Sequence, residues 1–242
     1  MNATVSTPMF DNSKPIRALL ARSGVQALLD IEGVNEVAIN RPFELWHEAG
    51  GVWHQHKAPE LNFMLCQQLA TSMAVQVANN SGQLQSNPIC PVLLPDGERG
   101  QIVIPPATEK NCISFTIRKP SNSRFTLDDY HDSGRLTGYK VVTKKTDIED
   151  FQKEMVMCVK NGDMRRFIQL AVDNKLNLLF GGATGSGKTT FSKAVVDLYP
   201  RNRRYITIED IHELQMPNHP NRVHLFFGPH MKAKELVQSC MR

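Results

Sequence analysis

The most informative segment of the chain reads LNLLFGGATGSGKTTF, from Leu176 to Phe191. Its first five residues, 176–180, have the composition of a buried strand, and the residues from about Lys188 to Leu198 have the pattern of a helix. The residues between them, from Gly182 to Thr189, fit the phosphate-loop pattern G-x-x-x-x-G-K-[ST] in the strand–loop–helix context that this motif requires. The segment therefore predicts a nucleotide-binding α/β domain.

Phosphate chemistry explains the spacing of this motif. Glycines let backbone N–H groups turn inward around the β-phosphate, and the N-terminus of the following helix adds partial positive charge. Lys188 is expected to bridge the β- and γ-phosphates, Thr189 to bind Mg²⁺, and Gly187 to leave room for the phosphate. The alternative is a glycine-rich turn without a ligand. The residues predicted to bind ATP are Gly182, Ala183, Thr184, Gly185, Ser186, Gly187, Lys188, Thr189 and Thr190.

A second apolar stretch, RYITIEDIHEL from Arg204 to Leu214, ends in two carboxylates. Ligands of α/β sheets bind at the carboxyl ends of strands, so Glu209 and Asp210 are predicted to face the nucleotide. There Glu209 would activate water and Asp210 would support Mg²⁺. Two alternatives stay open: the stretch is the Walker B strand, or Asp210 only caps a following turn.

The first half of the chain alternates between helix and strand patterns. Apolar residues recur at intervals of three and four in 16–29 and 61–77, which predicts two helices. Turns at 49–51 and 95–97 predict two hairpins. The predicted strands cover residues 37–39, 45–47, 52–54, 91–94, 101–104 and 113–118. These elements predict an N-terminal α+β domain of residues 1–131.

A polar stretch without apolar periodicity, residues 132–150, is interpreted as an interdomain linker. Two helices are predicted from the end of this stretch onward, over 149–159 and 164–172. Asp163 is expected to cap the second of them. The third part, residues 151–242, is the phosphate-loop domain.

Composition excludes several classes of protein. The net charge is +4 with scattered Lys and Arg residues, unlike a dedicated nucleic-acid binder. The five cysteines form no C-x-x-C pair, which argues against a zinc ribbon and a disulfide framework. No window approaches the length of a membrane span, so a cytosolic protein is expected. His54 and His56 could share a metal ion in a strand, but no third ligand is evident, and solvated or core histidines are favoured.

Four segments in combination resemble the secretion ATPases. Within that superfamily the chain is most similar to the traffic ATPase of bacterial type IV (conjugation-type) secretion systems, over almost all residues after roughly Asp30. The segments that carry the resemblance are IRKPS (117–121), GATGSGKTT (182–190), IEDIHEL (208–214) and HPNRVHLF (219–226).

The resemblance implies an N-terminal α+β domain followed by a RecA-like P-loop NTPase domain, with ATP bound between them. It also implies that Glu209, the first residue of the family's Asp box, orients the attacking water and that Arg118 reaches the phosphates. A guanidinium on a mobile domain would stabilise charge on the γ-phosphoryl group and couple hydrolysis to domain closure. The alternative for Arg118 is an exposed cation at a strand end.

The resemblance further implies a homo-hexameric ATP- and Mg²⁺-dependent motor for pilus assembly and export. Expected partners are other secretion-system ATPases and inner-membrane channel components, with peripheral contact to the inner membrane from the cytoplasm and no sequence-specific nucleic-acid binding. Two alternatives are an ATPase of type II secretion or type IV pili and a nucleotide-binding module without turnover.

One departure from the family pattern concerns the C-terminal end. Members of the family continue after a helix like 234–242 into a Walker B strand and a His box. We therefore expect a product truncated before Walker B, with little or no turnover and impaired ring assembly.

Overall fold

The computed structural model describes residues 13–76, 84, 87–120, 125–138, 148–229 and 231–241. The chain divides into two compact units. The first combines Met1–Pro120, Arg201–Glu213 and His219–Arg242, and the second combines Ser121–Pro200 and Leu214–Asn218. Residues 139–147 of the expected linker lie outside the described residues, as does Ser121 of the first family segment. The domain limits proposed from the sequence stay predictions.

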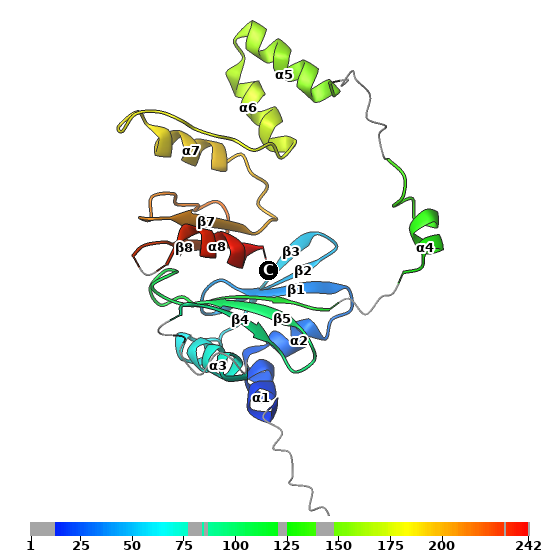
Figure 1. The fold of residues 1–242 in the computed structure, drawn as a ribbon, viewed down its shortest axis with the longest axis vertical. Coiled ribbons are helices and arrows are strands. Elements are labelled where there is room, and N and C mark those ends of the chain that lie inside the picture. The colour runs from blue at the N-terminus through cyan, green and yellow to red at the C-terminus, as the bar shows by residue number, and fades with distance from the viewer. Residues whose placement is uncertain are drawn as a thin grey trace, which may run out of the picture. The chain divides into compact units, whose positions relative to one another are not determined.

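Six antiparallel strands form the sheet of the first unit (Figure 1). Their order across the sheet is β3-β2-β1-β6-β5-β4. Each strand overlaps a run that its apolar and β-branched residues predicted. The strands are β1 (Val34–Ile39), β2 (Glu44–Ala49), β3 (Val52–Lys57), β4 (Ile89–Leu93), β5 (Arg99–Val103) and β6 (Ser114–Arg118).

Both predicted hairpins are confirmed, since β2 pairs with β3 and β4 pairs with β5. The turns use glycines with positive φ: 59° at Gly50, 83° at Gly51 and 90° at Gly97. Glycine enters this region without the steric penalty of a Cβ atom. These turns therefore set the register of two strand pairs.

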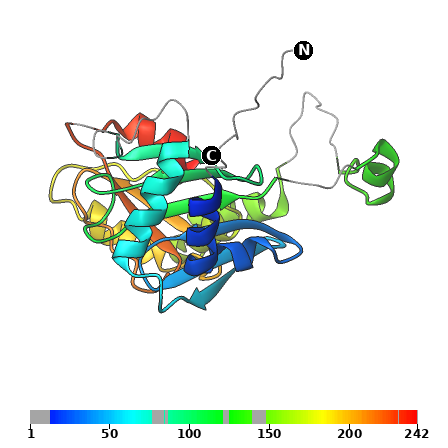
Figure 2. The same ribbon diagram turned by 90° about the horizontal axis from the view of Figure 1, so that it is seen from below.

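Three helices cover one face of this sheet (Figures 1 and 2): α1 (Ser13–Ser23), α2 (Val25–Leu29) and α3 (Phe63–Gln76). The single helix predicted over 16–29 was wrong, because Gly24 between α1 and α2 has a φ of 81° that interrupts it. The helix predicted over 61–77 corresponds to α3, and its last residue, Val77, lies outside the described residues. Fully buried residues such as Leu65 and Phe115 join the helices to the sheet.

The opposite face of the sheet carries a second, smaller core. The strand period of two places Ile102 in the core beneath the helices and Val103 in the second core. There Val103 packs with residues of β8 (Arg222–Phe226), such as Leu225, and of α8 (Ala233–Cys240), such as Leu236. β8 pairs in parallel with β7 (Tyr205–Glu209). The carboxylate-bearing strand β7 is thereby fixed to the N-terminal sheet.

A buried polar joint lies beside this second core. The guanidinium of Arg204 donates hydrogen bonds to Asn40 Oδ1 at 3.1 Å and to Thr116 Oγ1 at 2.6 Å. Asn40 Nδ2 in turn donates to Asn221 Oδ1 at 2.8 Å. Burial lowers the pKa of Arg204 to about 10, which leaves the side chain charged at neutral pH. A buried cation is stable only while these acceptors surround it.

The second unit contains α4 (Leu127–Asp132), α5 (Asp150–Asn161), α6 (Met164–Asp173) and α7 (Lys188–Val196). The helices expected at 149–159 and 164–172 are confirmed by α5 and α6. Asp163 caps α6 as predicted, because its side chain accepts a hydrogen bond from the Arg166 amide at 3.0 Å. α4 was not predicted. It begins with a capping box between Thr126 and Asp129.

The strand predicted over 176–180 was wrong, because these residues are irregular in the structure and Leu179 is 96% exposed. A strand needs a neighbour to pair its backbone N–H and C=O groups. Within the described residues of the second unit there is no other strand to supply one. The helix expected after the loop is confirmed as α7. Of the helices in the described part of the chain, none combines the length and apolar composition needed to cross a bilayer.

We predict that Arg204→Leu lowers the free energy of unfolding by roughly 1–3 kcal/mol, because Asn40 and Thr116 each lose a buried hydrogen-bond donor. Urea unfolding followed by circular dichroism measures the loss. The matched control is Arg203→Leu, since Arg203 is exposed and adjacent, and it should change stability by no more than about 0.5 kcal/mol. Equal stability of the two variants would contradict a stabilising joint at Arg204.

Candidate functional site

The predicted phosphate loop forms a tight turn that leads directly into α7. Gly185 and Gly187 have φ values of 79° and 84°, which other residues rarely adopt. Gly187 is the N-cap of α7, and residues 181–187 are exposed to solvent. A Cβ atom on Gly182 would lie only 2.6 Å from Ser186 Oγ. The backbone of the loop therefore depends on glycine at positions 185 and 187, and a side chain at position 182 would displace the Ser186 hydroxyl.

Lys188 folds back over this loop. Its ammonium donates hydrogen bonds to the carbonyl oxygens of Gly182 at 2.8 Å and Ala183 at 2.7 Å. The side chain thus lies across the concave side of the turn, with Thr184, Gly185 and Ser186 exposed around it. A phosphate oxygen would offer the same ammonium a charged acceptor in place of neutral carbonyls.

These features fit the phosphates of a nucleotide. The first N–H groups of α7 have no partner within the helix, and its dipole places partial positive charge at Gly187. Thr189 and Thr190 belong to the first turn of α7, beside Lys188. A hydroxyl at Thr189 is a suitable oxygen ligand for Mg²⁺. All nine predicted ATP-binding residues accordingly lie in one exposed loop and helix start.

Glu209 and Asp210 stand where the sequence predicted them, at the carboxyl end of β7. Glu209 is partly buried, and its Oε1 atom accepts a hydrogen bond from the backbone amide of Glu213 at 3.0 Å. Asp210 is exposed, and its Oδ1 atom accepts from the amide of Ile211 at 2.8 Å. This bond is to the adjacent amide, and both alternatives for Asp210, turn cap or Mg²⁺ support, stay predictions.

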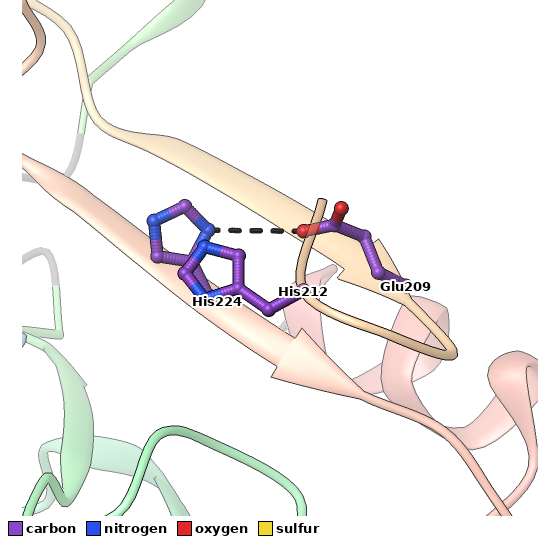
Figure 3. A group of neighbouring side chains, drawn as sticks. All are labelled: Glu209, His212 and His224. Carbon is purple, nitrogen blue, oxygen red and sulfur yellow. Dashed lines mark ion pairs between the residues drawn. The ribbon is translucent and has the colours of Figure 1, made fainter. Parts of the chain in front are cut away.

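Three residues to which the sequence gave no role lie around Glu209: Thr207, His212 and His224. Figure 3 shows the two histidines beside the carboxylate. Oε2 of Glu209 lies 2.9 Å from Thr207 Oγ1 and 3.9 Å from Nδ1 of His224. The ring of His212 lies against that of His224, with the centroids 4.2 Å apart. Burial, followed by the nearby charge of His212, lowers the pKa of His224, so this ring is kept neutral.

Register explains why these neighbours escaped prediction. Thr207 of β7 is the direct partner of His224 of β8 in the parallel ladder. His224 lies in a family segment and Thr207 directly precedes another, yet the sequence does not reveal which residue of one strand lies opposite which residue of the other. The only sequence signal would have been a polar residue in each of two apolar strands.

Glu209, His212 and His224 also offer three metal-ligand atoms within 4.8 Å of one another. A metal ion binds in the plane of each imidazole ring. The planes of His212 and His224 lie face to face at 38°, so their lone pairs do not converge on one point. Both oxygens of Glu209 already accept hydrogen bonds. We interpret the group as a hydrogen-bonded cluster.

The histidine pair His54 and His56 gains a neighbour in His47 of β2. The ring of His47 stacks on that of His54 with centroids 4.9 Å apart, and its Nδ1 atom lies 2.7 Å from Nε2 of His56. Burial first, and then the charges of the other two rings, lower the pKa of His47. A hydrogen bond between these two ring nitrogens accounts for the short distance.

Arg118 ends β6 and is largely exposed, with its Nε atom 3.9 Å from Glu36 Oε1. This position agrees with the alternative of an exposed strand-end cation, and its role toward phosphate stays a prediction. Arg118, Glu209 and Asp210 belong to the first unit, whereas the phosphate loop belongs to the second.

Comparison with known proteins adds independent findings. Residues 70–242 match the family model described as Type II/IV secretion system protein. The chain is 38% identical over 222 residues to the type IV secretion system protein VirB11 of Brucella suis, a match that covers 88% of this chain and 60% of the relative. It is 36% identical to the Bartonella quintana protein of the same name over 90% of this chain and 65% of the relative.

A solved structure is similar as well. The crystal structure of the VirB11 ATPase from the Brucella suis type IV secretion system, in complex with sulphate, superposes with a TM-score of 0.86. It is 37% identical, and the match covers 94% of this chain and 68% of that one. The chain spans between 60% and 65% of the length of the two curated relatives named above.

We predict that the stability of the chain falls as the pH is lowered through 6.5, in part because of His224. Its native pKa lies below the ordinary value of 6.5, so the unfolded state binds more protons between the two values. The contribution is complete above 6.5 and is lost as pH falls toward the native pKa.

The measurement is the change in Tm between about pH 7.5 and about pH 5.5 for the wild type, His224→Gln and the exposed control His131→Gln. The change should be smaller in His224→Gln and unaltered in His131→Gln. An identical change in all three proteins would show that His224 does not titrate with folding.

Proposed function

Because the chain belongs to the type II/IV secretion system protein family, whose model matches residues 70–242, we propose that it binds and hydrolyses ATP as a motor subunit of a type IV secretion system. In this proposal, hydrolysis powers substrate export and pilus assembly in conjugative transfer of DNA or protein. The relatives at 36–38% identity are named as type IV secretion proteins, which favours this system over type II secretion and type IV pili.

The observation that carries the proposal is the glycine-built loop closed by Lys188. Its exposed turn and the start of α7 offer an anion both N–H donors and an ammonium. The Brucella suis relative was crystallised in complex with sulphate, a tetrahedral anion like phosphate. Binding of the ATP phosphates is the function that this loop geometry supports best.

The proposed roles follow from the chemistry of each side chain. Lys188 and the backbone of Gly182–Thr190 hold the β- and γ-phosphates, while Thr189 and Asp210 support Mg²⁺, which would neutralise phosphate charge when bound. Glu209 accepts a proton from water as the water oxygen bonds to the γ-phosphorus and the bridging oxygen leaves with the electron pair of its P–O bond. Arg118 stabilises the developing charge.

The assembly is proposed on the same family relationship. We infer a homo-hexamer that acts in the cytoplasm, peripherally at the inner membrane, with other secretion-system ATPases and channel components as partners. A RecA-like domain with an N-terminal α+β domain is the fold that the similarity to the VirB11 ATPase supports.

A second candidate function is nucleotide binding without turnover. Lys188 and the rest of the phosphate loop belong to one compact unit, whereas Glu209, the proposed water-activating residue, belongs to the other. Nucleotide binding requires only the loop, whereas turnover also requires Glu209. Binding and turnover therefore need separate tests.

We predict that Lys188→Ala weakens Mg²⁺-ATP binding about 10- to 100-fold, because it removes a charged hydrogen-bond donor worth roughly 1.5–3 kcal/mol. Isothermal titration calorimetry measures the affinity. The control is Lys193→Ala, the other lysine of α7, which should bind like the wild type. Undiminished binding by Lys188→Ala would contradict a phosphate-loop role.

We predict that Glu209→Gln lowers kcat for ATP hydrolysis by about 10²- to 10⁴-fold without weakening ATP binding, since an amide cannot accept the proton of water. Phosphate release is measured for this chain and for a version extended with the C-terminal segment of the Brucella suis relative. The control is Glu60→Gln at an exposed carboxylate. Turnover by Glu209→Gln at the wild-type rate would exclude the proposed water-activating role.

A further inference from the structure

We propose that Thr207 and His224 are positioning residues that orient Glu209 through a directed chain of hydrogen bonds. The chain runs from His224 Nδ1 to Thr207 Oγ1 and from there to Glu209 Oε2. This inference rests on the proposed function in so far as Glu209 activates water. The hydrogen-bond chain itself is a property of the first unit and is testable without nucleotide.

The strand geometry brings the three groups together. Thr207 and Glu209 are two residues apart on β7, so their side chains project from the same face of the strand. His224 lies opposite Thr207 in the parallel ladder. Thr207 Oγ1 is 2.8 Å from His224 Nδ1 and 2.9 Å from Glu209 Oε2. Both distances are those of good hydrogen bonds.

Donor counting gives the chain a direction. An ionised carboxylate only accepts hydrogen bonds, and a threonine hydroxyl has a single proton to donate. Thr207 therefore donates to Glu209 and must accept from His224. It follows that the neutral ring of His224 carries its proton on Nδ1. The reverse tautomer would set two acceptors, Nδ1 and the carboxylate, against one hydroxyl proton.

The buried position of these hydrogen bonds makes the arrangement rigid. Thr207 is 7% and His224 is 2% exposed, so water does not compete with the two bonds. The carbonyl oxygen of His224 accepts a hydrogen bond from Thr108 Oγ1 at 3.0 Å, which anchors β8 to the N-terminal part of the same unit. The other oxygen of Glu209, Oε1, accepts from the amide of Glu213 at 3.0 Å.

Fixed on both oxygens, the Glu209 carboxylate cannot rotate freely about its terminal bond. A group that accepts a proton in the transition state acts best when it is held in one orientation. Loss of the Thr207 hydroxyl would remove its hydrogen bond to Oε2 while leaving the carboxylate in place. The expected consequence is a lower kcat at unchanged ATP affinity, because the defect concerns the reacting water and not the phosphates.

The decisive experiment is ¹⁵N NMR of the histidine rings of this chain at about pH 8, where neutral imidazole predominates. The His224 signals are identified by their loss in His224→Gln. We expect the Nδ1–H tautomer in the wild type and in Thr207→Ser, which keeps the hydroxyl. Thr207→Val should lose that tautomer preference. A wild-type His224 ring protonated at Nε2, or a preference for the Nδ1–H tautomer that survives in Thr207→Val, would contradict the proposed chain of hydrogen bonds.

Turnover of the extended protein supplies the second readout. Thr207→Val should lower kcat about 10- to 100-fold, the effect of one charge-assisted hydrogen bond, with KM and ATP affinity unchanged and with Thr207→Ser close to the wild type. Wild-type kcat in Thr207→Val would refute the positioning role even if the tautomer is confirmed. Failure of the wild type to bind ATP would instead refute the proposed function and leave the tautomer result standing.

Discussion

The hydrogen bonds of the partly buried Arg204 guanidinium are the interaction on which the arrangement of the first unit depends. A cation removed from water is stable only if nearby acceptors replace its hydration. Asn40 and Thr116 of the N-terminal sheet supply those acceptors, and Asn40 extends the contact to Asn221 beside β8. Arg204 directly precedes β7, the strand that carries Glu209, so these hydrogen bonds tie the start of that strand to the sheet.

From this joint the order extends along β7. The parallel pairing with β8 sets Thr207 against His224, and the apolar contacts of Leu225 and Leu236 with Val103 hold the pair on the sheet. Glu209 at the end of the strand receives hydrogen bonds on both carboxylate oxygens. In the second unit, the glycines of the phosphate loop fix its turn around Lys188. The orientation of the Glu209 carboxylate and the shape of the phosphate loop are therefore each determined by contacts within one unit.

The sequence was sufficient where the determining interactions are short-range. The phosphate loop, the glycine turns at Gly50 and Gly97 and the Asp163 cap each depend on neighbours within a few residues, and all were predicted. The prediction of a strand at 176–180 was wrong because a strand needs a neighbouring strand for its backbone hydrogen bonds, and the local sequence does not reveal whether one is present. The prediction of a single helix over 16–29 was wrong because the spacing of the apolar residues continues past Gly24, whereas the backbone of Gly24 has a φ of 81° and interrupts the helix. The roles of Arg204 and His224 were not predicted, because each contacts residues that are distant from it in the sequence.

The most direct test of the account is calorimetric titration of this chain with ATP, ADP and AMP in the presence of Mg²⁺. A loop that recognises the β- and γ-phosphates through Lys188 should bind ATP and ADP and should not bind AMP, which has neither phosphate. Binding of AMP as tight as that of ATP would contradict recognition through the phosphate loop. The absence of binding by all three nucleotides would contradict the proposed ATP site as a whole.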